Sequence, residues 1–300
     1  SNDYAISPDG KEIAWVQQKD VTRLIDPSTL TLLTLKSRKT RTIDLGKMWL
    51  AAPAYSHDGT RLAVLATPDD APSKHTRLML VDHKSGKAER LAANWPRSVG
   101  TYGSANPVWS ADDSAILFCA EDSGVQHLWH LPLNAEQPTA IVHGGHVMSF
   151  SQSKDGNTTV YTQASIDHPA RLYTLDTESK KGHRRLDRLN AFLDKIPLGK
   201  WESRTVKGWQ GEPIQTFVIY PPKYDAKKKY PLLHSIHGGP HAAHMDTWHY
   251  RWNVHAFAAQ GYVVAAVNYH GSSGFDEKFL GSIDGDLGPR ELADTEAVTD

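Results

Sequence analysis

Short runs of alternating apolar and polar residues, each following a turn, dominate the first two hundred positions of this chain. The same design recurs four times, in YAISPDGKEIAWV, PAYSHDGTRLAVLA, PVWSADDSAILFCA and MSFSQSKDGNTTVYTQA. The serines that open the four turns are Ser7, Ser56, Ser110 and Ser153. Alternation predicts half-buried strands, and several short strands repeated every roughly 40 to 50 residues are typical of β-propeller blades.

The composition of the turns has a physical reason. In the first copy, Pro8 presets φ, Asp9 can hydrogen-bond the local backbone, and Gly10 accepts a positive φ without steric cost. The third copy has Asp113 after Asp112 where the first has glycine. A short polar side chain tolerates the left-handed region better than a bulky one, so the same turn is predicted there.

Each repeat continues with a connection and a second pair of strands. TRLMLVDHKSGKAERLA is one such pair, with Ser85 and Gly86 at its hairpin turn, and ARLYTLDTESKKGHRRL is another. One blade cannot bury both of its faces, so blades must stack in a closed ring. The pattern predicts an all-β propeller over residues 1–198 with at least four visible blades, and further blades upstream unless the ring is unusually small. A plain β-sandwich with chance similarity between its turns is the alternative.

The pattern changes near residue 200, where longer apolar runs alternate with helical ones. WESRTVKGWQGEPIQTFVIYPP predicts a hairpin, PLLHSIHG and YVVAAVNYHG predict buried strands, and WNVHAFAAQG and GPRELADTEAVTD predict helices, with Gly261 ending the first and Pro289 opening the second. This alternation favours a parallel sheet covered by helices, so residues 199–300 are predicted to form a second, α/β domain. The ends of the two buried strands then meet at one edge, where such sheets bind ligands.

The composition excludes several classes of function. Lys and Arg number 33 against 34 Asp and Glu, so no basic excess indicates nucleic-acid binding, and the apolar runs are too short to span a membrane. The only cysteine, Cys119 in AILFCA, predicts a buried, inert thiol and no disulfide within the chain. That is compatible with the cytosol and equally with the periplasm. The chain also begins inside a repeat, so the natural N-terminus is expected to lie upstream and the compartment stays open.

Two glycine-rich stretches, HGGPH and NYHGSSG, fall at the predicted ligand-binding edge. A phosphate loop needs a Lys-Ser/Thr pair after its glycines, and none follows Gly239. His237 and His241 are four residues apart, but Gly-Gly-Pro between them forbids the helix that would align two imidazoles for a metal. Solvated side chains are therefore predicted for the loop histidines His241, His244 and His249, and neither a metal nor a cofactor is expected.

Acyl transfer is the remaining chemistry for this loop. It develops negative charge on a carbonyl oxygen, which preorganised backbone N–H groups stabilise. A His-Gly-Gly loop after a central strand is how α/β-hydrolases supply one such donor. Glycines also let the backbone approach a substrate closely.

The stretches HGGP, DTWHYRWN, FAAQGYVVAAVNYHGSSGF and SIDGDLG resemble the start of the catalytic domain of the prolyl oligopeptidase family, nearest to its dipeptidyl-peptidase V and acylaminoacyl peptidase branch. The resemblance implies a propeller followed by the start of an α/β-hydrolase domain, over residues 1–198 and 199–300. It implies that the Gly239 N–H is an oxyanion donor and that three neighbours shape the substrate-binding loop: His237, Gly238 and Pro240. In the second loop, the matching positions are Asn268, Tyr269, Gly271, Ser272 and Gly274. The family usually has Arg at His270, so loop packing and substrate contacts are expected to differ there.

The sequence has no Gly-x-Ser-x-Gly nucleophile elbow. We therefore expect the chain to stop before the catalytic serine, so that the Ser/Asp/His triad lies outside it and the 300-residue segment alone is inactive. The resemblance implies that the intact protein is a serine exopeptidase acting near the N-terminus of short peptides. A homo-oligomer is compatible with this interpretation. A non-catalytic binding protein with a degenerate hydrolase domain, or a carboxylesterase, are the alternatives. Glu121 and Asp122 are candidates for gripping a substrate amine, or ordinary turn carboxylates.

Overall fold

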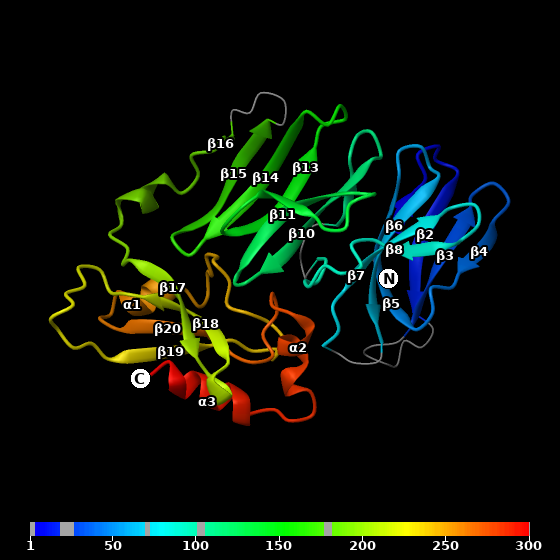
Figure 1. The fold of residues 1–300 in the computed structure, drawn as a ribbon. Coiled ribbons are helices and arrows are strands. Elements are labelled where there is room, and N and C mark those ends of the chain that lie inside the picture. Colours follow the sequence, from blue (N-terminus) through cyan, green and yellow to red (C-terminus); the bar gives the residue numbers. More distant parts are fainter. Residues whose placement is uncertain (1–3, 19–26, 70–72, 101–105, 177–181, 300) are drawn as a thin grey trace.

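The computed structural model describes residues 4–18, 27–69, 73–100, 106–176 and 182–299. Strands are the main regular elements among these residues, and in the first two thirds of the chain they form two four-stranded antiparallel sheets and one eight-stranded sheet that contains a parallel pair (Figure 1). No helix among these residues is long and apolar enough to cross a membrane.

Four consecutive four-stranded units, called units 1 to 4 here, form the N-terminal region. Unit 1 contains β1 (Tyr4–Ile6), β2 (Glu12–Gln18), β3 (Ser28–Thr34) and β4 (Lys39–Ile43). Unit 2 contains β5 (Met48–Tyr55), β6 (Arg61–Pro68), β7 (Arg77–Asp82) and β8 (Ala88–Arg90). Unit 3 contains β9 (Val108–Trp109), β10 (Ala115–Asp122), β11 (Val125–Pro132) and β12 (Thr139–Val142). Unit 4 contains β13 (His146–Gln152), β14 (Thr158–Ser165), β15 (His168–Asp176) and β16 (His183–Arg185).

The predicted turns and hairpins are confirmed. Each turn serine donates its hydroxyl hydrogen to the aspartate two residues later, as Ser7 Oγ does to Asp9 at 2.7 Å. The predicted left-handed conformation is present at Gly10 (φ 69°) and also at Asp113 (φ 55°). The hairpin between β7 and β8 turns at Ser85 and Gly86. The connection between β15 and β16 falls partly on residues 177–181, outside the described residues.

The apolar cores of this region lie between neighbouring units and not within them. Leu30 of unit 1 and Leu62 of unit 2 share one cluster. Phe118 of unit 3 packs with residues of unit 2 in a second cluster, and Cys119 packs with Tyr161 of unit 4 in a third. Each unit therefore needs its neighbours to bury its faces. The prediction that Cys119 is a buried thiol is confirmed.

A four-stranded sheet flanked by short helices follows after the 3₁₀ turn η1 (Ala191–Lys195). Its strands are β17 (Trp201–Lys207), β18 (Pro213–Ile219), β19 (Leu232–Ile236) and β20 (Val263–Asn268), in the spatial order β17-β18-β20-β19. The helical elements are η2 (Trp209–Gly211), α1 (Val254–Ala258), α2 (Glu277–Leu280), η3 (Gly281–Ile283) and α3 (Pro289–Ala297). Figure 1 shows this sheet, with α1 and α3, below units 3 and 4.

The sheet agrees with the sequence in part. β19 and β20 are parallel as predicted, but β17, β18 and β20 are antiparallel, so the sheet is mixed. β20 is buried as predicted, whereas the prediction of a buried β19 is wrong, since Ile236 is 62% exposed. Among the strands that the structure describes, β19 pairs with β20 alone and lies at the edge of the sheet, so one of its flanks is uncovered there. Gly261 and Pro289 end α1 and open α3 as predicted.

Candidate functional site

Two loops meet at one edge of the sheet. The first loop (residues 237–248) follows β19, and the second loop (residues 269–275) follows β20. Because β19 and β20 are parallel neighbours, both loops leave from the same edge. The two loops are hydrogen-bonded to each other, since Ser273 N–H donates to the Ala242 carbonyl at 3.0 Å. The structure thus brings together the two glycine-rich stretches that the sequence singled out.

Gly239 occupies a conformation that favours glycine. Its φ is +71°, and a Cβ at this position would meet only the Ala242 side chain, at 3.9 Å. Its carbonyl accepts a hydrogen bond from the Ala242 N–H at 2.9 Å. Among the described residues, none accepts a hydrogen bond from the Gly239 N–H, and the residue is exposed. This donor is therefore available to an oxygen atom of a ligand.

His237, the first residue of the loop, is held by the second loop. Its ring stacks on that of Tyr269 with centroids 4.1 Å apart. The Tyr269 hydroxyl donates to the His237 carbonyl at 2.7 Å. Burial, reinforced by the charge of nearby His244, lowers the pKa of His237 to about 4. The imidazole is therefore neutral at neutral pH, and its role in the loop is one of packing and hydrogen bonding.

His237 and Ser272 form a contact that resembles a catalytic dyad but is not one. His237 Nε2 lies 2.9 Å from Ser272 Oγ. Ser272 donates its only hydroxyl hydrogen to the Tyr269 carbonyl at 2.7 Å, and it is 0% exposed. His237 Nε2 must then carry a hydrogen and donate to the serine. A general base needs an unprotonated nitrogen facing the hydroxyl, so this contact is structural.

Asn268, at the end of β20, ties the two loops together more firmly. Its Oδ1 accepts from the His244 N–H at 2.6 Å, and its Nδ2 donates to the His244 carbonyl at 2.9 Å and to Gln215 Oε1 at 2.8 Å. His244 Nε2 also lies 2.7 Å from the Ser235 carbonyl. The prediction of a solvated His244 is therefore wrong, because tertiary contacts bury it, and burial lowers its pKa. His249 is exposed as predicted.

His241 also differs from the sequence prediction. Its Nδ1 lies 3.1 Å from the Gly271 carbonyl, and its Nε2 lies 3.4 Å from Asp284 Oδ1. The prediction of a solvated side chain is wrong here too, because the second loop folds back onto the first. Among the described residues, no group of three or more His, Cys, Asp or Glu side chains could hold a metal.

Asp246 anchors the first loop to units 3 and 4. Its carboxylate accepts from the N–H groups of Gly145 at 3.1 Å and Ile166 at 2.8 Å. Its own N–H donates to the Gly124 carbonyl at 2.7 Å. Burial raises the pKa of Asp246, although these hydrogen bonds oppose the shift. No local sequence signal marks this role, because its partners lie 80 to 101 residues away.

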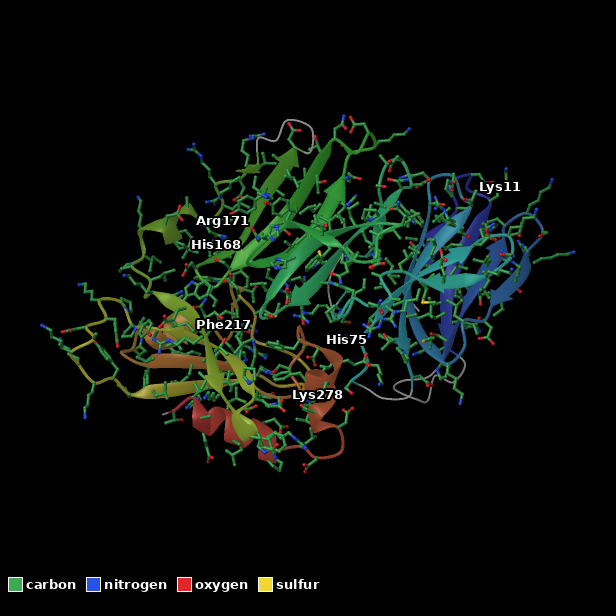
Figure 2. All side chains as sticks on the ribbon, viewed as in Figure 1. Lys11, His75, His168, Arg171, Phe217 and Lys278 are labelled. Carbon is green, nitrogen blue, oxygen red and sulfur yellow. The ribbon has the colours of Figure 1, made fainter. Side chains whose placement is uncertain are left out.

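The second loop also contacts the units. Ser123, in the turn between β10 and β11, donates its N–H to the Gly274 carbonyl at 2.8 Å. Glu121, in β10 just before this turn, also approaches the second loop. Burial raises the pKa of Glu121, while a hydrogen bond with Ser273 opposes the shift. From unit 2, Arg77 and Lys74 pair with Glu277 of α2 at 2.8 and 3.3 Å. In Figure 2, His75 and Lys278 mark the two sides of this last contact. The site therefore lies where the sheet meets the β units.

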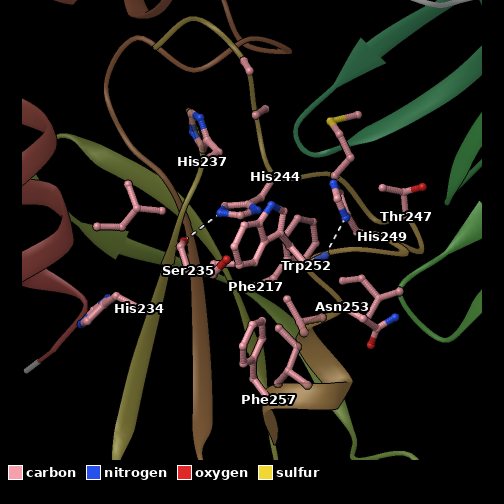
Figure 3. Close-up of a pocket in the computed structure, with 18 of the residues that line it drawn as sticks. Phe217, His234, Ser235, His237, His244, Thr247, His249, Trp252, Asn253 and Phe257 are labelled. Carbon is pink, nitrogen blue, oxygen red and sulfur yellow. Dashed lines mark hydrogen bonds between the residues drawn. The ribbon is translucent and has the colours of Figure 1, made fainter. Parts of the chain in front are cut away.

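A cavity of about 590 Å³ opens beside the first loop (Figure 3). Its walls are largely apolar and include Phe217, Trp252 and Phe257, with Ile166 contributed by unit 4. His237 and Gly238 also line it. Gly239 follows directly in the chain, so the free N–H lies one residue beyond the cavity wall. The cavity suits an apolar group held next to a polar loop.

Comparison with known proteins shows what this chain is similar to. The prolyl oligopeptidase family matches residues 248–300. Dipeptidyl-peptidase 5 of Porphyromonas gingivalis is 29% identical over 298 residues, which cover 97% of this chain and 42% of that protein. Dipeptidyl-peptidase 5 of Arthroderma otae is 30% identical over 308 residues, covering 96% and 41%. The chain thus spans about two fifths of the length of these relatives.

Solved structures show the same fold. Acylaminoacyl peptidase of Pyrococcus horikoshii superposes with a TM-score of 0.77 at 19% identity, over 96% of this chain and 43% of that one. A puromycin-hydrolyzing peptidase of Mycobacterium tuberculosis gives a TM-score of 0.69 at 21% identity, over 98% and 46%. The sequence relatives span both the β units and the sheet with its two loops. These matches show that the chain is similar to members of the prolyl oligopeptidase family and shares their fold over the part compared.

Proposed function

We propose that the intact protein is a serine exopeptidase that hydrolyses peptide bonds near the N-terminus of short peptides. The observation that carries this proposal is the Gly239 N–H, which has no acceptor among the described residues and lies on a loop held rigidly by Asn268 and Tyr269. A fixed donor costs no reorganisation when a carbonyl oxygen becomes an oxyanion. One such donor is typically worth about 3–4 kcal/mol of transition-state stabilisation.

We assign residues 1–198 to a β-propeller domain and residues 199–300 to the N-terminal part of an α/β-hydrolase domain. Two features support the assignment: the four units pack in chain order with cores between them, and β19 offers a free edge to a further strand. We place the nucleophile, its acid and its base outside these 300 residues, and the proton arrangement of the His237–Ser272 contact, which is wrong for a catalytic dyad, supports this placement.

In the proposed reaction the serine attacks the scissile carbonyl while the catalytic histidine takes its proton. The tetrahedral oxyanion accepts a hydrogen bond from Gly239, and His237, Gly238 and Pro240 shape the loop that presents this donor. Asn268 and Tyr269 hold that loop in place from the neighbouring strand. The apolar cavity beside Gly238 accommodates a substrate side chain.

The names of the relatives support the peptide substrate. The curated relatives are called dipeptidyl-peptidase 5, and one structural neighbour is an acylaminoacyl peptidase. Both names describe removal of a short group from the start of a peptide. For this protein we propose the same class of substrate, with contacts from units 3 and 4 limiting access to short chains.

The test is direct labelling and turnover with the full-length protein. A fluorophosphonate probe should label one serine, and a dipeptide amide or an acylaminoacyl amide should be cleaved, with cleavage abolished by prior labelling. The matched control is the corresponding acyl ester, which separates a peptidase from a carboxylesterase. If no serine is labelled and no amide is cleaved, the protein is a binding protein and the proposal fails.

A further inference from the structure

A buried histidine of the second loop lies between two carboxylates. The side chain of His270 is 1% exposed. Its Nδ1 lies 2.7 Å from Asp294 Oδ2, and its Nε2 lies 3.2 Å from Glu212 Oε2. The His270 backbone N–H donates to the same Asp294 oxygen at 2.7 Å. A hydrogen bond to both carboxylates requires a hydrogen on both ring nitrogens, which is the imidazolium form.

These three residues, the His270 cluster, join three separate segments. Asp294 belongs to α3 and is 0% exposed, and its Oδ1 accepts from the Trp209 N–H in η2 at 2.7 Å. Glu212 follows η2, and its side chain is 43% exposed. The cluster therefore connects the second loop, α3 and the β17–β18 turn at one buried carboxylate.

The surroundings leave His270 as the cation that faces Asp294. Phe279 of α2 stacks on its ring at 4.7 Å, and Trp209 meets it edge-on at 5.9 Å. The other charged groups nearby point elsewhere. Lys278 reaches Glu212 at 3.6 Å from the solvent side, and Arg290 lies over the Trp209 ring and pairs with Asp286.

The His270 cluster is connected to the candidate site through the residues that flank His270 in the chain. Tyr269, immediately before His270, donates to the His237 carbonyl, and Asn268 holds both backbone groups of His244. Gly271, immediately after it, has φ +95°, and a Cβ there would lie 2.2 Å from Ile283 Cδ1. The backbone at residues 268–271 therefore has little freedom, and a change at His270 is transmitted to the first loop.

We propose that His270 is a positioning residue whose imidazolium fastens the second loop to α3, so that the order of both site loops depends on pH. Deprotonation removes the hydrogen that Nε2 shares with Glu212 and leaves Asp294 buried opposite a neutral ring. The loops then lose part of their support while the sheet stays folded. This role of the His270 cluster is independent of the peptidase proposal, because it concerns the order of the loops in the absence of substrate.

The charges around His270 determine how loop order changes with pH. Burial disfavours charge on the ring, but the hydrogen bonds and charges of Asp294 and Glu212 outweigh it, so the pKa of His270 is raised. A raised folded-state pKa stabilises the folded form fully below the unfolded value of about 6.5. That contribution is lost as the pH rises through the folded-state pKa. The loops are therefore most ordered in mildly acidic solution and loosen towards alkaline pH.

The experiment measures amide hydrogen exchange of the two site loops, residues 237–248 and 269–275, in the full-length protein, expressed as protection factors between pH 6 and pH 9. Wild-type protection should fall at least three-fold over this range. His270→Gln, which stays neutral, should show low protection at both ends and no pH-dependent change. The matched control is His57→Gln, which removes another histidine–aspartate contact, that with Asp113 at 2.7 Å, in the β units. It should behave as the wild type does.

A second measurement keeps the proposal testable if His270→Gln does not fold. The ring pKa of His270 in the wild-type protein can be read from histidine nitrogen shifts by NMR, and it should exceed 6.5. A pKa below that value, pH-independent protection in the wild type, or a retained pH dependence in His270→Gln would each overturn the proposal. None of these readouts requires catalytic activity.

Discussion

The β units and the site loops stabilise their polar groups in opposite ways. In the units, polar contacts of the turns are local: Ser56 donates to Asp58 two residues away, and Asp58 accepts from the Thr60 N–H at 2.9 Å. In the site loops, polar contacts are long-range and buried, as Asp246 and Asn268 show. Local contacts can form in any context that allows the turn, whereas the site loops acquire their shape only when distant segments are in place.

One residue of the units combines both kinds of contact. Asp113 occupies the left-handed turn position in unit 3, and its carboxylate also accepts from the N–H groups of His57 and Asp58 in unit 2, both at 2.9 Å. Glycine at this position would supply the turn geometry but not the link between units. The departure from the repeat pattern therefore has a tertiary reason.

The largest expected effect breaks the core between two units. Phe118→Ala should lower the free energy of unfolding by about 3–5 kcal/mol, because a buried aromatic side chain is lost and a cavity remains. Urea denaturation followed by circular dichroism would measure it. Phe192→Ala is the control, since that side chain is 64% exposed, and it should change stability by less than about 0.5 kcal/mol. Similar losses for both variants would contradict cores between units.

The next largest expected loss of stability distinguishes a carboxylate with long-range partners from one with local partners. Asp246→Ala leaves the N–H groups of Gly145 and Ile166 without their acceptor and should cost about 2–4 kcal/mol. It should also raise hydrogen exchange in residues 237–248. Asp155→Ala, in an exposed turn of unit 4, should cost less than about 1 kcal/mol. Equal losses, or unchanged exchange in the first loop, would show that Asp246 does not anchor it.

A smaller effect tests the hydrogen bond between the two loops. Tyr269→Phe removes the donor to the His237 carbonyl without changing the ring stack, and should cost about 1 kcal/mol. Tyr250→Phe is its control, because Tyr250 is 78% exposed. Thermal unfolding would compare the two. A neutral Tyr269→Phe would mean that stacking alone holds His237.

The smallest effect distinguishes the two regions by pH. Hydrogen bonds from Ser56 and Ser110 lower the pKa values of Asp58 and Asp112 to about 2. Because the pKa of each carboxyl is lower in the folded state, the carboxylates stabilise the folded form above their unfolded pKa of about 4. This contribution is lost as the pH falls towards 2. Solvent screening keeps it small. Ser56→Ala should therefore reduce the acid dependence of stability, measured by urea midpoints between pH 2 and pH 9. It also removes the acceptor of the Arg61 N–H at 3.0 Å, a loss that is the same at every pH. A variant that alters the pH dependence on the alkaline side would refute this separation.

The sequence predicted the strands, the turns and the first loop because their signals are local. Alternation and the recurring turns indicated repeated four-stranded units, and the resemblance to a known family pointed to Gly239. The edge position of β19 was missed, because an apolar run does not reveal how many neighbours a strand has. The burial of His244 and the role of Asp246 were missed for a related reason, since their partners lie far away in the chain.

By itself, then, the sequence determined the repeat, the change to an α/β pattern near residue 200, and the two glycine-rich loops that follow β19 and β20. Only the tertiary structure decided which nitrogen of His237 carries a hydrogen, which carboxylate secures the first loop, and why histidine at position 270 lies between two acids. Hydrophobic periodicity and turn chemistry act over a few residues. Protonation and buried hydrogen bonds depend on groups that only folding brings together.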